Sequence, residues 1–372
     1  MNKVNRDLSY YVFIPAGPIY EKGKYAGISH LIEHILFNFL EQDKKFDEYL
    51  NKHNIYYSVS TNEHFTYVVF EEIDRNHLRY IQEKLKSIFK DPKYSEKVIE
   101  YEKDIIKEEI LFYKEDRVSL AEDYLNKLIF HNKSLKQPTR GSLKSVLGFS
   151  KNNLESWHKR LYEKENIIEI VYSNKSNKVN ITAKKNLNIP KARLAKLTPL
   201  WVLKNKWKSK SIICGWAVKN ITKEELIKLN LIRRIFSEQS HNKEGRALIS
   251  SEKVYYKEVM VGHFNGFSII YFHFFNSRPK SILKSIISIS QDYPLIDSCI
   301  ENNWEESIKK ELDYYQLSGG DKVYEIGSDM LTRGEIITVE ERIDVLKNIK
   351  LKELQEFYRK IFNSGFFQEV IG

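Results

Sequence analysis

Two histidines and a glutamate fall within five consecutive residues of this chain, His30-Leu31-Ile32-Glu33-His34. Residues three and four apart are neighbours on the surface of a helix. If this segment is helical, His30 and His34 present two imidazoles on one face, and Glu33 presents a carboxylate toward the same place. Two imidazoles can bind one zinc ion, and a carboxylate beside the ion can accept a proton from water. The spacing therefore predicts metal-dependent hydrolysis.

A catalytic zinc ion takes three protein ligands, so a third ligand must come from another element. The best candidate is Glu109, in a helix predicted over residues 95–113. Glu102 lies seven residues earlier, close to two helical turns, so both carboxylates face the same side. A ligating histidine usually donates its second N–H to a carboxylate, which is the role expected of Glu102. The alternative third ligand is Glu108, rotated by about 100° on the same helix.

Strands and helices predicted in the first half must bring these side chains together. Residues 8–14 are rich in aromatic and β-branched residues and predict a strand, followed by the helix that carries His30. Residues 56–70 predict a hairpin or one long, bent strand. Helical spacing of apolar residues predicts a further helix over 78–89, and residues 167–172 predict a closing strand.

The pattern begins again in the second half. A stretch rich in Asn and Lys shows little periodicity and predicts a linker. Beyond it, residues 211–218 predict a strand and residues 223–236 a helix. Two halves that each run from strand and helix to helix and strand predict an α+β fold of two similar lobes. The predicted domains are an N-terminal lobe over 1–175, a linker over 176–205 and a C-terminal lobe over 206–372.

Composition excludes several classes of protein. The net charge is +10 and the calculated pI is about 9.1, but the lysines are interspersed with acidic residues and no nucleic-acid recognition motif accompanies them. No apolar run approaches the roughly 20 residues of a membrane span, and the N-terminus does not resemble a signal peptide. Cys214 and Cys299 form no Cys-x-x-Cys pair. We expect a cytoplasmic protein that binds neither nucleic acid nor membrane.

The quoted motifs resemble those of the pitrilysin or insulinase metallopeptidases, a family that includes the mitochondrial processing peptidase. The family's apolar strand and small-residue turn correspond to YYVFIPAG, its G-x-x-H-x-x-E-H-x-x-F to residues 27–37, and its E-x(6)-E to Glu102 and Glu109. The resemblance covers most of residues 8–172. It implies a clam-shell of two similar lobes, each a mostly antiparallel sheet packed with helices, which closes on an extended peptide.

The resemblance also implies a role for each site residue. It implies one zinc ion per chain, bound by His30, His34 and Glu109, with Glu33 as general base and Glu102 as the supporting carboxylate. It further implies that residues 58–61 form the edge strand along which an extended peptide lies. The substrate-binding candidates on this strand are Ser58, Val59 and Thr61.

The second half departs from the family pattern. Family members usually carry an Arg and a Tyr that complete the substrate site, and the corresponding stretch here is residues 249–256. Tyr256 matches the tyrosine, but Ser250 or Ser251 stands where the arginine should be. The resemblance therefore implies a zinc endopeptidase whose partner is a related subunit that lacks H-x-x-E-H and supplies the Arg and Tyr. Processing of the leader of a ribosomal peptide is one function that the family permits. The alternative is a non-catalytic scaffold or assembly subunit derived from the same family.

Overall fold

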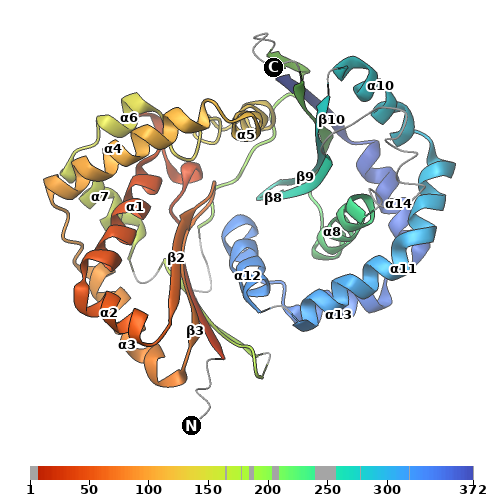
Figure 1. Ribbon diagram of the computed structural model, residues 1–372. Coiled ribbons are helices and arrows are strands. Elements are labelled where there is room, and N and C mark those ends of the chain that lie inside the picture. The colour runs from red at the N-terminus through yellow and green to blue at the C-terminus, as the bar shows by residue number, and fades with distance from the viewer. Residues whose placement is uncertain are drawn as a thin grey trace. The chain divides into compact units, whose positions relative to one another are not determined.

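The computed structural model describes residues 7–163, 166–176, 178–183, 188–202, 209–238, 257–276, 278–317 and 319–371 (Figure 1). The chain divides into two compact units that interleave along the sequence. Unit 1 comprises residues 1–114, 132–190 and 318–336, and unit 2 comprises residues 115–131, 191–317 and 337–372. Each domain predicted from the sequence is instead one continuous stretch of chain. That division into domains remains a prediction.

Unit 1 contains a five-stranded antiparallel sheet in the order β2-β3-β1-β4-β5. Its strands are β1 (Leu8–Ile14), β2 (Tyr56–Thr61), β3 (Thr66–Ile73), β4 (Ile168–Ser173) and β5 (Lys178–Thr182). The central strand β1 is buried along its whole length. Its alternating side chains Tyr10 and Val12 enter the main core, whereas Phe13 contacts the ring of Tyr324. Burial on both faces explains the continuous apolar run that marks this strand in the sequence.

Helices cover both faces of this sheet (Figure 1). One face carries α1 (Ile28–Gln42), α2 (Lys44–Lys52), α3 (Arg75–Lys90), α4 (Glu96–Tyr113), α6 (Leu143–Leu147) and α7 (Lys151–Leu161). The other face is covered by α12 (Gly320–Arg333), which comes from late in the chain. A Cβ at Gly327 of α12 would lie 2.3 Å from Cζ of Phe13, so this close packing requires glycine.

Unit 2 repeats the same strand order. Its sheet runs β6-β10-β7-β9-β8, which matches unit 1 when β7 to β10 are paired with β1 to β4. The strands are β6 (Leu200–Val202), β7 (Lys210–Lys219), β8 (Lys257–Phe264), β9 (Phe267–Asn276) and β10 (Gly365–Ile371). Only the pair of β6 with β10 is parallel among these described strands. The helices are α5 (Arg117–Ile129), α8 (Lys223–Glu238), α10 (Pro279–Ser290), α11 (Tyr293–Leu317), α13 (Val339–Asn348) and α14 (Leu351–Phe362).

The predicted α+β fold with two similar, mostly antiparallel sheets is confirmed. Two features differ from the sequence prediction. The segment predicted as a linker contains β5 and β6, whose Lys- and Asn-rich strands lie at sheet edges and therefore lack a strong apolar pattern. In addition, α5 lies in the sequence between helices of unit 1 but belongs to unit 2. Conversely, α12 lies in the sequence between helices of unit 2 but belongs to unit 1. No described helix combines the length and apolar character needed to span a membrane. Cys214 and Cys299 are buried and form no disulfide.

Side-chain caps begin most helices of unit 1. Asp43, Asp74, Ser95 and Ser150 each accept a hydrogen bond from a backbone N–H in the first turn of α2, α3, α4 and α7. Helix α1 differs, because its N-cap residue is Gly27, which has no side chain and adopts a φ of +90°. The free N–H groups at the start of α1 must therefore find another acceptor.

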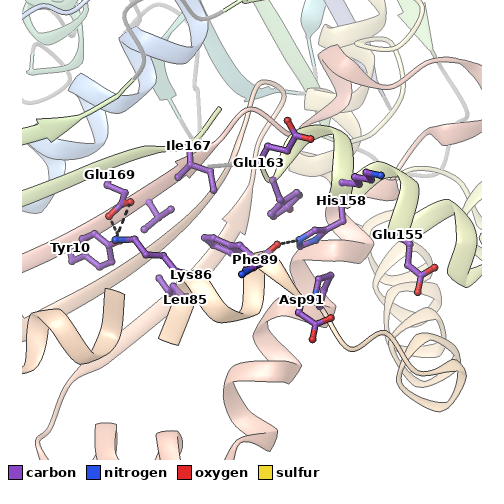
Figure 2. Close-up of a pocket in the computed structure, with 15 residues that line it drawn as sticks. Tyr10, Leu85, Lys86, Phe89, Asp91, Glu155, His158, Glu163, Ile167 and Glu169 are labelled. Atoms are coloured by element: carbon purple, nitrogen blue, oxygen red, sulfur yellow. Dashed lines mark hydrogen bonds and ion pairs between the residues drawn. The ribbon is translucent and has the colours of Figure 1, made fainter. Parts of the chain in front are cut away.

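A cavity of about 770 Å³ opens between α3 and α7 above β1 and β4 (Figure 2). Hydrogen bonds within the fold hold two of its lining side chains, Tyr10 and His158. The Tyr10 hydroxyl donates to Glu169 at 2.7 Å, and His158 accepts from the Tyr94 hydroxyl through Nδ1 and donates from Nε2 to the Phe89 carbonyl at 2.8 Å. Burial lowers the pKa of His158 to about 4. This histidine is a neutral structural residue.

Glu369 on β10 is buried at an energetic cost. It is 0% exposed, and neither carboxylate oxygen has a hydrogen-bond partner among the described residues. Burial raises its pKa well above the usual value, and the nearby charge of Lys127 offsets only part of this rise. Folding therefore takes up a proton, so the free energy of unfolding falls as the pH rises above about 4.5, by up to about 1.4 kcal/mol per pH unit.

We expect Glu369→Gln to stabilise the fold at pH 7, by on the order of 1 to 3 kcal/mol, and to remove this part of the pH dependence. Urea unfolding at pH 5 and pH 8 measures both effects. Glu356→Gln is the matched control, because Glu356 is an exposed residue of α14 and its loss changes the net charge equally. A Glu369→Gln variant that keeps the wild-type slope with pH would contradict the assignment.

Candidate metal centre

Helix α1 presents its apolar residues to the core and its polar residues to the site. Ile28, Leu31, Ile32 and Ile35 are fully buried in the main core. The two imidazole rings of His30 and His34 lie with centroids 4.7 Å apart. The helical face predicted from the sequence is therefore the face that the fold turns toward α4.

Helix α4 brings a carboxylate to the two histidines. Oε2 of Glu109 lies 3.7 Å from Nε2 of His30 and 3.5 Å from Nε2 of His34. One ligand atom from each of the three residues lies within 4.8 Å of the others, and no other such group occurs in the described part of the chain. Ligands of a tetrahedral zinc ion, at bond lengths of about 2 Å, lie about 3.3 Å apart. These three side chains can hold one divalent ion with small adjustments.

The phase of α4 distinguishes the two candidate glutamates. The helix begins at a Ser95 cap, and this start turns Glu102 and Glu109 toward α1. Glu108 points outward, with a side chain that is 72% exposed and 3.7 Å from Lys107. The structure thus brings Glu109, and not Glu108, to the histidine pair.

Glu102 fixes the orientation of His34. Nδ1 of His34 donates to Oε2 of Glu102 at 3.2 Å, so Nε2 is the atom directed to Glu109. The second oxygen of Glu102 accepts from Nδ2 of Asn38 at 3.0 Å. Sequence reasoning missed Asn38, although its position four residues after His34, on the same face of α1, is a usable signal.

Glu33 lies beside the ligand atoms and is tied to the edge strand. Its carboxylate is 3.8 Å from Nε2 of His30. Burial raises its pKa to about 7, against the charge of His34 and hydrogen bonds from the hydroxyl and backbone N–H of Thr61, which lower it. A carboxylate with this pKa can both take and return a proton near neutral pH. Thr61, predicted to contact substrate, thus also contacts Glu33.

The charges of the site favour a cation. Burial lowers the pKa of His30 to about 4. Burial also acts to lower the pKa of His34, but hydrogen bonds with Glu102 and Glu109 and the charge of Glu33 outweigh it and raise the value to about 9. The three carboxylates that hold a proton on His34 would equally hold a divalent ion in its place.

The predicted substrate strand lies at an edge of the sheet. Strand β2, which carries Ser58, Val59 and Thr61, pairs only with β3 among the described strands. A cavity of about 810 Å³ lies beside it, and its lining includes Glu33, His34, Phe37, Val59, Tyr101 and Ile105. Tyr256 and the rest of residues 249–256 lie outside the described residues.

Comparison with known proteins finds similar sequences for part of the chain and similar structures for nearly all of it. Residues 2–142 match the model of the insulinase family, peptidase family M16. The N-terminal part of the chain is therefore similar to this family. An uncharacterized zinc protease of Bacillus subtilis (strain 168), YmxG, is 25% identical to this chain over 179 residues. That alignment covers 46% of this chain and only 42% of YmxG.

Two solved structures share the fold over nearly the whole chain. A putative M16-like peptidase from Alicyclobacillus acidocaldarius has a TM-score of 0.75 at 15% identity, with 98% of this chain and 93% of that chain covered. A protease from Helicobacter pylori has a TM-score of 0.80 at 14% identity, with 98% and 94% covered. At these identities the likeness establishes the fold alone.

Proposed function

We propose that this chain is a zinc-dependent endopeptidase that cleaves peptides bound in an extended form. The observation that carries the proposal is the convergence of Nε2 of His30, Nε2 of His34 and Oε2 of Glu109, with His34 held by Glu102. Two imidazoles and one carboxylate are a donor set that catalytic zinc sites use. The zinc protease among the chain's relatives supports the choice of metal.

Each residue of the site has a chemical task in this proposal. His30, His34 and Glu109 would hold the zinc ion, which would supply Lewis acidity to lower the pKa of water toward about 7 and to polarise a carbonyl group. The carboxylate of Glu33 takes a proton from the attacking water and later gives it to the departing amine nitrogen. Thr61, at the end of β2, lies beside the Glu33 carboxylate and favours its charged form.

The edge strand and its neighbouring cavity suggest how the substrate binds. An extended peptide can pair with the free edge of β2 through main-chain hydrogen bonds, which are largely independent of sequence. The cavity beside β2 contains Phe37, Tyr101 and Ile105, each partly exposed, and suits a large apolar side chain next to the cleaved bond. Leader peptides of ribosomal peptides are one substrate class included in this proposal.

We further propose that the chain works as the catalytic subunit of a cytoplasmic heterodimer. The sequence has Ser250 and Ser251 where family members usually carry an arginine. A related subunit that lacks H-x-x-E-H but carries the Arg and Tyr would supply the missing contacts to the peptide.

Metal analysis and a cleavage assay test these proposals separately. The purified chain is expected to bind one zinc ion, and a fluorogenic peptide library is expected to be cleaved much faster when a related subunit is added. Absence of zinc refutes the endopeptidase. Equal rates with and without the second subunit refute the heterodimer. Bound zinc without cleavage in any mixture favours a scaffold or assembly subunit.

A further inference from the structure

The two histidines of the metal centre are supported in different ways. Nδ1 of His34 is held by Glu102 at 3.2 Å. Nδ1 of His30 is buried and has no hydrogen-bond partner among the described residues. A ligating histidine normally gains its orientation from a bond at its second nitrogen. The orientation of the His30 ring must therefore come from the backbone that carries it and from packing.

Glu21 holds this part of the backbone. It lies in the loop between β1 and α1 and is only 2% exposed. Its Oε2 accepts from the backbone N–H of Gly27 at 2.8 Å, and its Oε1 accepts from the N–H of Ser29 at 3.0 Å. The carboxylate thus supplies the cap that Gly27 cannot provide. Ser29 directly precedes His30, so the Glu21 contact fixes the turn from which the ligand projects.

A close backbone contact with the segment around Gly141 also holds the first turn of α1. Gly27 and Gly141 both have positive φ, +90° and +75°. A Cβ at Gly27 would lie 2.7 Å from the carbonyl oxygen of Arg140, and a Cβ at Gly141 would lie 2.5 Å from that of Ala26. The chain at 26–27 therefore packs directly on the chain at 140–141. The start of α1 has little freedom to shift once Glu21 is in place.

We propose that Glu21 is the positioning residue of His30. Its carboxylate, bound to two N–H groups at the positive end of the helix dipole, sets the first turn of α1 so that Nε2 of His30 meets Glu109. The metal centre is then held by two different devices, a side-chain carboxylate for His34 and a capping carboxylate for His30. This inference rests on the zinc site proposed above.

Glu21→Gln tests the proposal with little change in size. The amide oxygen can accept from one N–H, but the amide NH2 group confronts the other N–H. We expect zinc affinity, measured by competition with a chromophoric chelator, to fall about 10- to 100-fold, as on loss of other residues that support a metal ligand. The absorption spectrum of the cobalt-loaded protein should change, because it reports the geometry of the ligands.

Asp74→Asn is the matched control. Asp74 caps α3 by accepting from the N–H of Asn76 at 2.9 Å, and α3 carries none of the metal-site residues. We expect this variant to lose some thermal stability and to keep the wild-type zinc affinity and cobalt spectrum. Glu21→Asp, whose shorter side chain reaches only one of the two N–H groups, should give an intermediate affinity and serves if Glu21→Gln does not fold.

The outcomes separate this inference from the proposed function. A Glu21→Gln protein with wild-type zinc affinity and cobalt spectrum overturns the positioning role. So does an Asp74→Asn protein whose affinity falls equally, because the loss would then reflect general destabilisation. A wild-type chain that binds no zinc instead overturns the metal site itself.

Discussion

Glu33→Gln should leave zinc bound and lower kcat by about 10²- to 10⁴-fold, the usual contribution of a general base. Glu33 stands beside the ligand atoms, 3.8 Å from Nε2 of His30, but it is not part of the group of three that can hold the ion. Glutamine keeps the shape of the side chain and an oxygen that can accept from Thr61. It cannot take a proton from water. Zinc content and steady-state cleavage of a fluorogenic peptide, measured on the active assembly, give the two quantities.

Glu108→Gln is the control for this experiment. It removes the same charge from the neighbourhood of the site, but the Glu108 side chain points to solvent. Its zinc content and kcat should equal those of the wild type. Loss of zinc from Glu108→Gln would instead mean that the third ligand has been assigned to the wrong glutamate. A Glu33→Gln protein with wild-type kcat would remove Glu33 from the mechanism.

The local geometry of the site could be predicted because helical spacing determines it. On α1, the three- and four-residue steps from His30 to Glu33 and His34 place the three side chains on one face. On α4, the seven-residue step from Glu102 to Glu109 does the same. No local pattern encodes the meeting of the two helices, which follows from the need for a third ligand and from the family resemblance.

The supporting contacts could not be predicted, because they join segments whose approach depends on the whole fold. Thr61 reaches Glu33 only because the end of β2 lies beside α1. Glu21 caps α1 across a loop of irregular structure, where no periodicity marks a partner. Helix α12 covers the second face of β1 from about 300 residues later in the chain. The continuous apolar sequence of β1 indicates that both of its faces are covered, but it does not indicate which helix covers the second face.

Removal of a ligand should have a larger effect than removal of a support. His34→Ala deletes the atom nearest Glu109 and leaves two ligands, fewer than a catalytic zinc site requires. We expect it to lose stoichiometric zinc and all measurable cleavage. Glu102→Ala keeps all three ligands and frees only the His34 ring, so its zinc affinity should fall about 10- to 100-fold. Saturating zinc should then restore most of its kcat.

A zinc titration of activity separates these two cases. The Glu102→Ala curve should shift to higher zinc and reach a plateau near that of the wild type, whereas the His34→Ala curve should stay flat. The difference follows from the contacts: His34 contributes Nε2 to the ion, and Glu102 contributes only the bond at Nδ1 that orients it. Treatment of the wild type with a chelator should reproduce the His34→Ala result and be reversed by zinc. Full cleavage by a chelated wild type would refute metal dependence, because His30, His34 and Glu109 would then have no part in the reaction.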